Sequence, residues 1–274
     1  MMIGFSVENN YPVPMDEAVR LLHRIGFDAV SFNWKLGVDL TGGIQAARSL
    51  DMPIHYLHAP QGAYHTLWTQ DAPEMLQLIL QTLEDCKSWS VPIYVLHTCS
   101  DFVPITPDRA IGERNFRRIT DTAARYGITV AFENTARPSY LKALMELYAD
   151  DPHVGYCWDS GHEQCYAPQE DFLAQYGDRL LVTHLNDNIG MSTPGEPNSA
   201  DDLHLIPGDG IADWVNQLKR LRGANKVDIL SFELKRVSKP NQKLRLYDDL
   251  SLAEYFEKVY VHALKLEDAY RRSW

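Results

Sequence analysis

The sequence has few cysteines, no long apolar run and no glycine-rich or serine-rich linker. Four cysteines in 274 residues, none in a Cys-x-x-Cys pair, are too few for a disulfide framework, so we expect reduced, mostly buried thiols. No apolar run approaches the roughly 18 residues that a membrane span needs. The N-terminus also lacks the basic start and apolar stretch of a signal peptide. These absences argue against a membrane role and predict a cytoplasmic protein.

Basic residues are in the minority as well. The sequence contains 26 Lys and Arg against 37 Asp and Glu, a formal net charge of −11. Proteins that mainly neutralise nucleic-acid phosphates carry the opposite balance. Nucleic acid is therefore disfavoured as a partner, although a bound metal or a local basic patch could still serve a small site.

The chain does contain a regular alternation of short β-branched or aromatic runs and longer amphipathic stretches. The eight candidate strands are 2–7, 27–32, 53–58, 92–97, 128–133, 154–159, 179–184 and 227–233. Helical patterns with apolar positions three to four residues apart include 15–26, 73–89, 107–127, 210–223 and 250–272. Long loops are expected at 185–209 and 234–249.

Eight strand–helix units predict an α/β fold, and a (β/α)₈ TIM barrel is the simplest architecture. The composition does not change along the chain, which predicts a single domain over 1–274. A doubly wound open sheet is the alternative. It is disfavoured because the first strand–helix turn has no glycine-rich phosphate loop.

From the third strand onward, every predicted strand ends in histidine or a carboxylate. These residues are His58, His97, Glu133, Asp159, His184 and Glu233. All strands of a parallel barrel end at the face that carries active sites, so we expect these side chains to converge. His162 follows Asp159 by three residues, and Asp202 and His204 form an Asp-x-His pair in the loop after the seventh strand.

One such polar residue at a strand end could simply be solvated, but six of six favour a metal site. Imidazole and carboxylate ligands without cysteine suit Zn²⁺, Mn²⁺ or Co²⁺, with Mg²⁺ also allowed. Each ligating histidine needs a partner for its second ring nitrogen, and Asp187 and Glu163 are candidates for this role.

At these residues the sequence resembles the xylose isomerase-like TIM-barrel superfamily, which contains sugar isomerases and epimerases and also endonuclease IV. The resemblance covers nearly the whole chain and is carried by 58–60, 132–134, 159–162, 184–187, 204–210 and 232–233. In the family's ketose 3-epimerases one metal is held by a Glu, an Asp, a His and a second Glu. Glu133, Asp159, His184 and Glu233 match this pattern.

The resemblance implies a metal-dependent sugar or sugar-phosphate isomerase or epimerase in which Glu133 and Glu233 are also the catalytic acid–base pair. This chemistry is physically reasonable, because a metal bound to a sugar carbonyl and its neighbouring hydroxyl stabilises an enediolate. Two carboxylates can then remove a proton from one face and return one to the other. Lyases and dehydratases that use the same intermediate stay open.

Endonuclease IV is similar but uses nine ligands for three zinc ions. This sequence also offers nine: His58, His97, Glu133, Asp159, His162, His184, Asp202, His204 and Glu233. A zinc-dependent phosphodiesterase is therefore the alternative, in which His58, His97, His162, Asp202 and His204 hold additional metal or contact the substrate. The loop 61–74 has no Lys or Arg for DNA phosphates, which argues against it. A sugar-binding barrel without catalysis is a third interpretation.

Three further residues are candidates for binding substrate. Trp34 and Trp68 lie near strand ends, where they could stack on a sugar or simply pack the barrel mouth, as Tyr64 and Trp158 could also do. Lys235 opens a basic segment, 235–245, that also contains Arg236, Lys239, Lys243 and Arg245. The segment could bind a phosphate or be a solvated loop. The sequence leaves a homo-oligomer open.

Overall fold

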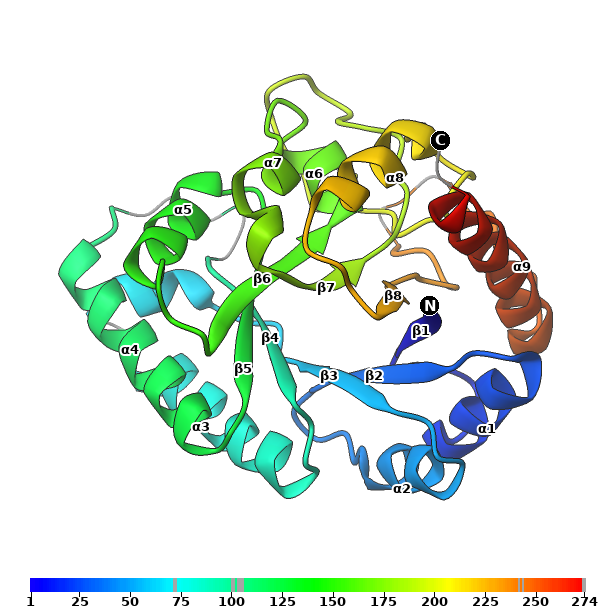
Figure 1. Ribbon diagram of the computed structural model, residues 1–274, viewed down its shortest axis with the longest axis horizontal. Helices are drawn as coiled ribbons and strands as arrows, with labels where there is room; N and C mark the ends of the chain where they lie inside the picture. Colours follow the sequence, from blue (N-terminus) through cyan, green and yellow to red (C-terminus); the bar gives the residue numbers. More distant parts are fainter. Residues whose placement is uncertain (71–72, 100–101, 103–105, 241, 243, 273–274) are drawn as a thin grey trace.

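The strands form one parallel eight-stranded sheet in the order β7-β6-β5-β4-β3-β2-β1-β8 (Figure 1). The structure is a computed structural model that describes residues 1–70, 73–99, 102, 106–240, 242 and 244–272. The strands are β1 Met2–Val7, β2 Ala29–Asn33, β3 Ile54–His58, β4 Ile93–His97, β5 Thr129–Glu133, β6 Val154–Asp159, β7 Leu180–His184 and β8 Ile229–Phe232. All eight lie where the sequence predicted them, within two residues at each end.

The sheet curves round so that β7 and β8 meet. Leu185 and Phe232 form a parallel bridge, and the Leu185 amide donates to the carbonyl oxygen of Ser231 at 2.9 Å. The Ser231 amide donates to Thr183 Oγ1 at 3.0 Å. The result is a nearly closed barrel, which confirms the predicted (β/α)₈ fold.

Helices surround the barrel (Figure 1). They are α1 Met15–Ile25, α2 Thr41–Ser49, α3 Pro73–Ser88, α4 Arg109–Arg125, α5 Pro138–Leu147, α6 Ser160–Tyr166, α7 Phe172–Tyr176, α8 Trp214–Gly223 and α9 Leu252–Arg271, with short 3₁₀ turns η1 Tyr64–Trp68 and η2 Gly177–Arg179. The helix predicted from 210 begins at Trp214 instead. The reason is the cap: the Asp213 side chain accepts from the Asn216 amide at 3.1 Å and starts the helix there.

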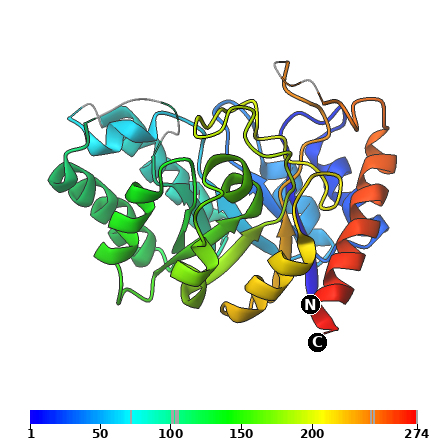
Figure 2. The same ribbon diagram turned by 90° about the horizontal axis from the view of Figure 1, so that it is seen from above.

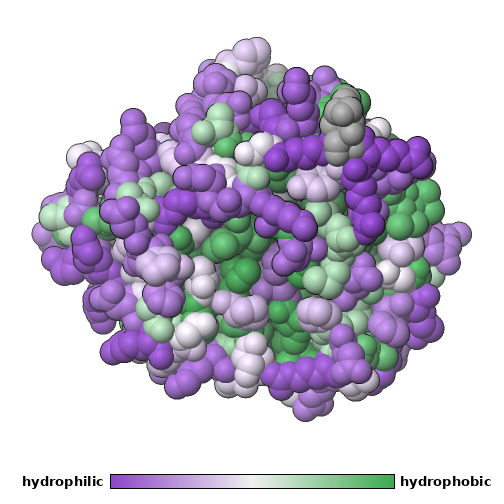
Figure 3. Space-filling view, viewed as in Figure 1, coloured by the Kyte–Doolittle hydropathy of each residue, from purple (hydrophilic) through white to green (hydrophobic). Residues whose placement is uncertain are grey.

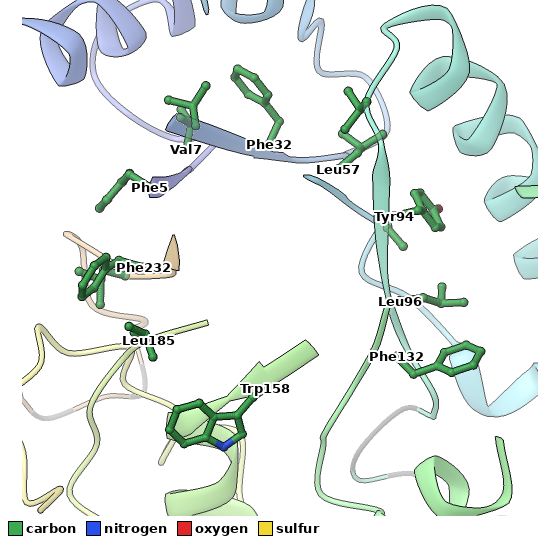
Figure 4. Close-up of a cluster of buried hydrophobic side chains, with 14 of the residues drawn as sticks. Phe5, Val7, Phe32, Leu57, Tyr94, Leu96, Phe132, Trp158, Leu185 and Phe232 are labelled. Carbon is green, nitrogen blue, oxygen red and sulfur yellow. The ribbon is translucent and has the colours of Figure 1, made fainter. Parts of the chain in front are cut away.

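Side chains alternate between the two faces of each strand. One set points outward and packs under the helices, as Figure 4 shows for Phe32, Leu57, Tyr94, Leu96 and Phe132. The other set points into the barrel, where Tyr56, Val95, Ala131, Cys157 and Val182 form a small inner core. The strand-end ligand candidates have the parity of this inner set, so the pleat itself directs them to the barrel axis.

The loops after β7 and β8 lie at the end of the barrel away from both chain termini (Figure 2). On the face shown in Figure 3, hydrophilic side chains cover most of the rim. All four cysteines are buried thiols that form no disulfide, and burial raises the pKa of the Cys86 and Cys157 thiols to about 12. Among the described residues, no helix combines the length and apolar character required to cross a membrane.

Candidate metal centre

Glu133 lies at the centre of a histidine cluster at the carboxyl ends of the strands. Its Oε1 is 3.2 Å from Nδ1 of both His162 and His184. Its Oε2 is 3.1 Å from Nε2 of His58 and 3.3 Å from Nε2 of His97. The side chain has no exposed surface. Four histidines from separate βα units therefore meet at one buried carboxylate.

The four residues that match the epimerase pattern also meet. Glu133, Asp159, His184 and Glu233 each offer one ligand atom, and these atoms all lie within 4.8 Å of one another. His184 Nδ1 is 3.2 Å from Glu233 Oε2 and 3.8 Å from Asp159 Oδ2. A single divalent ion could touch all four.

The remaining candidates form two adjoining groups. One is His58, His97 and Glu133, and the other is His162, Asp202 and His204. In the second group, Asp202 Oδ2 is 2.9 Å from His204 Nε2, and Asp202 Oδ1 is 3.9 Å from His162 Nε2. That Oδ1 atom is buried and has no hydrogen-bond partner, which suits a ligand atom.

The motif around Asp159 has a local structural reason. Asp159 is the N-cap of α6, and its Oδ1 accepts from the His162 amide at 2.7 Å, which fixes the three-residue spacing. Gly161 between them leaves room for Asn186, because a Cβ at Gly161 would lie 1.7 Å from Asn186 Oδ1. Asn186 Nδ2 in turn donates to both Asp159 oxygens at 3.1 Å.

Backbone carbonyls orient three of the histidines. Nδ1 of His58 lies 2.7 Å from the Ala59 oxygen, Nδ1 of His162 lies 3.0 Å from the Asn134 oxygen, and Nδ1 of His204 lies 3.0 Å from the Glu233 oxygen. A carbonyl only accepts, so each Nδ1 carries a proton, and Nε2 is the ring nitrogen left to bind an ion.

Asp187 and Glu163 do not have the predicted role of orienting histidines. Glu163 accepts from Trp158 Nε1 at 3.1 Å and pairs with Arg220 at 2.6 Å. Asp187 accepts from the amides of Gly208 and Ala212 and from Trp214 Nε1. Both residues lie close to the predicted ligands in the sequence, but their carboxylates bond to the loop after β7 and to side chains of β6 and α8 instead.

Charges within the cluster balance one another. Burial works to raise the pKa of Glu133, but His184, His97 and His162 outweigh it and hold this pKa well below its usual value. Burial likewise works to lower the pKa of His162, yet Asp159 and Glu133 hold it well above its usual value. Buried carboxylates thus need positive charge beside them, which a divalent ion also provides.

The loops after β7 and β8 hold each other beside the cluster. Asp202 Oδ2 lies 3.3 Å from Lys239 Nζ and 3.7 Å from Lys235 Nζ, and Gln242 Nε2 donates to the Asp202 carbonyl at 2.9 Å. His204 adopts a left-handed φ of 50°, which costs energy for a residue other than glycine. Strain of this kind is typical of functional sites.

Other basic residues of 235–245 face their own loop. Arg236 donates to the carbonyl oxygen of Leu250 at 2.7 Å, and Arg245 pairs with Asp248 at 2.6 Å. Lys243 lies outside the described residues. Lys235 and Lys239 are therefore the basic side chains of this segment, among those described, that reach the site.

A cavity of about 750 Å³ opens above the cluster. Trp34, Lys235 and Glu233 line it, as do His58, His97, His162, Asp202 and His204. Glu133 is not among the lining residues, because the histidines enclose it. Glu233, with 14% of its side chain exposed, is the more accessible of the two proposed catalytic glutamates.

Glu8 and Asn33 also line the cavity and were not predicted. Both follow the inward parity of their strands, since Gly4, Ser6 and Glu8 alternate with Phe5 and Val7, which pack outward. Burial raises the pKa of Glu8, although Lys235 and His204 oppose this. The predicted first and second strands end at Val7 and Phe32, so only the inward parity carried one residue further would have found both residues.

Trp68 is not placed to bind substrate. Only 2% of it is exposed, and its Nε1 donates to the Thr98 carbonyl at 2.7 Å. A Cβ at Gly112 would lie 2.1 Å from the ring, so α4 packs directly against it. Trp158 is fully buried too. Both residues are core anchors, because η1 and β6 turn these indoles toward the helices.

Fold and site together define a barrel with a buried histidine–carboxylate cluster at the carboxyl ends of its strands. Residues 19–252 match the family model of the xylose isomerase-like TIM barrel. The chain belongs to this family, which confirms the resemblance seen in the motifs. Among curated proteins, y4fM of Sinorhizobium fredii, an uncharacterised protein, is 28% identical over 205 residues, or 70% of this chain. The chain spans about 60% of the length of that relative.

Solved structures show the same fold at low sequence identity. IolI with a bound zinc atom has a TM-score of 0.75 and 18% identity, covering 100% of both chains. The 3-keto-D-glucoside 4-epimerase YcjR of E. coli has a TM-score of 0.69 and 18% identity, covering 97% of this chain and 99% of the other. Other matching structures are of sugar 3-epimerases acting on allulose and ribulose.

Proposed function

We propose that the protein is a metal-dependent sugar isomerase or epimerase. The observation that carries the proposal is the meeting of Glu133, Asp159, His184 and Glu233 within 4.8 Å. The donor set fits a divalent ion, since it combines carboxylates and imidazole without thiolate. Zn²⁺, Mn²⁺ and Co²⁺ suit it best, and Mg²⁺ is allowed. Similar structures of sugar epimerases and of a zinc-bound protein support the assignment.

Glu233 is the base in this proposal. An ion held by the cluster would polarise the carbonyl and hydroxyl oxygens of a bound sugar. Glu233 reaches the cavity, and although burial works to raise its pKa, His184 and His204 hold it low, so it is ionised and able to take a proton from carbon. Glu133 is the second proton-transfer group. The expected partner is a small sugar or sugar phosphate, with Lys235 and Trp34 lining its cavity.

The experiment is proton exchange in D₂O. Protein loaded with Zn²⁺, Mn²⁺ or Co²⁺ is incubated with ketoses, keto-glycosides and their phosphates, and incorporation of deuterium at carbon is followed by NMR. We expect exchange with at least one sugar and a loss of about 100-fold or more in Glu233→Gln. Asp209→Asn is the control, because Asp209 pairs with Lys258 away from the cavity lining. Exchange that is unaffected in Glu233→Gln would refute the role of this base.

A second function, zinc-dependent phosphodiester cleavage of the endonuclease IV type, is favoured by one observation. All nine candidate ligands fall into three adjoining groups, enough for about three ions rather than one. Elemental analysis counts the metal per chain, and an abasic DNA duplex tests cleavage directly. One ion and no cleavage favour the sugar enzyme, whereas three ions with cleavage favour the nuclease.

A further inference from the structure

The cavity extends well beyond the ligand cluster. Its inner end is lined by Glu233 and the histidines, whereas its outer end reaches Leu78, which lies on α3 outside the barrel (Figure 1). Trp34 and Leu36 after β2 and Gln61 after β3 line it as well. About 750 Å³ is in the upper half of the range for pockets that enclose drug-sized ligands. A single hexose at the metal end would leave the outer end unfilled.

Trp34 is fixed in place at the outer end. Its Nε1 donates to Asp85 Oδ2 on α3 at 2.8 Å, and its backbone amide donates to the His58 carbonyl at 2.9 Å. An aromatic ring that is already held loses little freedom when a ligand stacks on it. Trp34 is therefore a preorganised platform.

The wall around Trp34 combines apolar and neutral polar groups with the charged side chain of Lys35. Leu36 is 74% exposed, a large apolar side chain that a ligand in the cavity would cover. Gln61 supplies amide hydrogen-bonding groups beside it. Lys235 and Lys239 lie toward the inner end and are engaged by Asp202. This outer wall suits a ring with C–H faces that stack on Trp34 and hydroxyl edges that bond to Gln61 and Lys35.

We propose that the outer end is a second sugar subsite, so that the substrate is a disaccharide or glycoside whose second pyranose ring rests on Trp34. The proposal rests on the proposed function, because the reacting sugar has to occupy the metal end. The glycosidic bond stays intact, and the second ring contributes binding and position.

Binding by calorimetry tests the subsite separately from turnover. Metal-loaded protein is titrated with maltose, cellobiose, lactose and sucrose and with their constituent hexoses. We expect at least one disaccharide to bind about tenfold or more tightly than its constituent hexoses. Trp34→Ala should remove this preference, and Trp34→Phe should keep part of it.

Leu36→Ala provides a second variant that tests the subsite without disturbing the core, since Leu36 is exposed. It should also reduce the preference for disaccharide. Ile211→Ala is its matched control, because Ile211 is 66% exposed and does not line the cavity. Equal affinity for disaccharides and hexoses, or a preference unchanged in both Trp34→Ala and Leu36→Ala, would overturn the subsite. Absence of deuterium exchange with every sugar, with the binding preference intact, would count against the proposed function alone.

Discussion

At the scale of single residues, Glu133 is the group that most of the cluster shares, since ring nitrogens of four histidines lie within 3.3 Å of its oxygens. Glutamine keeps its shape and removes its charge. Mutating a residue that only hydrogen-bonds to a metal ligand lowers metal affinity by about 10–100-fold. Glu133 is a candidate ligand itself, so we expect Glu133→Gln to weaken Zn²⁺ binding by about 100-fold or more. Competition with a chromogenic chelator measures this.

The matched control is Glu8→Gln. Glu8 is a carboxylate of the same cavity but belongs to none of the ligand groups found among the described residues. The Glu8→Gln variant should keep the Zn²⁺ affinity of the unmodified protein within about threefold, a smaller change than losing a hydrogen-bond partner of a metal ligand would cause. Equal losses in both variants would indicate a general effect of charge rather than ligation by Glu133.

His55 makes stability depend on pH. It lies in β3 with Nδ1 2.8 Å from Ser231 Oγ, and burial, with a contribution from His184, lowers its pKa to about 4. An unfolded histidine titrates near 6.5, so below that pH the unfolded chain binds the proton first and the free energy of unfolding falls. In metal-free protein, His55→Asn should remove roughly 2 kcal/mol of the decrease between pH 6.5 and 4.5. Denaturant unfolding at several pH values checks this, and parallel profiles for the two proteins would contradict it.

At the scale of elements, Asp187 organises the segment between β7 and α8. It accepts from the amides of Gly208 and Ala212 and from Trp214 Nε1, at 2.8 to 3.1 Å. Asp187→Ala leaves these donors without their acceptor, so we expect a loss of about 2–4 kcal/mol in stability. The same segment carries Asp202 and His204, so any metal they hold should be lost as well.

Chemical denaturation and elemental analysis measure the two effects. Asp213→Ala is the matched control, because Asp213 only caps α8 by accepting from the Asn216 amide. It should cost about 1 kcal/mol and leave the metal content unchanged. Normal metal content in Asp187→Ala would show that the loop positions its ligands without this carboxylate.

At the scale of the whole molecule, the contact between β7 and β8 is a weak part of the barrel. β4 and β5 pair over five residues, from Ile93 with Thr129 to His97 with Glu133, whereas β7 and β8 share a single isolated bridge. His184 ends β7 and Glu233 follows β8, so an ion bound by both residues would link the two strands. Removing metal with a chelator should speed amide hydrogen exchange across β7 and β8 by about tenfold or more. The β4 and β5 amides should not change; uniform acceleration would refute the idea.

The sequence predicted the barrel and the convergence of the ligand candidates because both follow from local regularities. A period of two decides which face each strand-end residue takes, and parallel strands put those ends together. Trp68 could not be assigned this way, since its burial depends on how η1 packs against Gly112 of α4. The predicted role of Asp187 and Glu163 in orienting histidines was wrong for a similar reason. Their partners Trp214 and Arg220 come from α8, and no spacing rule relates them.

Three of the histidines have their ring protons fixed by main-chain carbonyls of Ala59, Asn134 and Glu233. An arriving cation would meet imidazoles whose Nδ1 protons are already held, so the rings would not have to turn when it binds through Nε2. Because these carbonyls belong to the main chain, substituting a single side chain does not remove the groups that orient the histidines. Coordination chemistry could then change by exchanging individual ligands while the ring orientations of the others stay as they are.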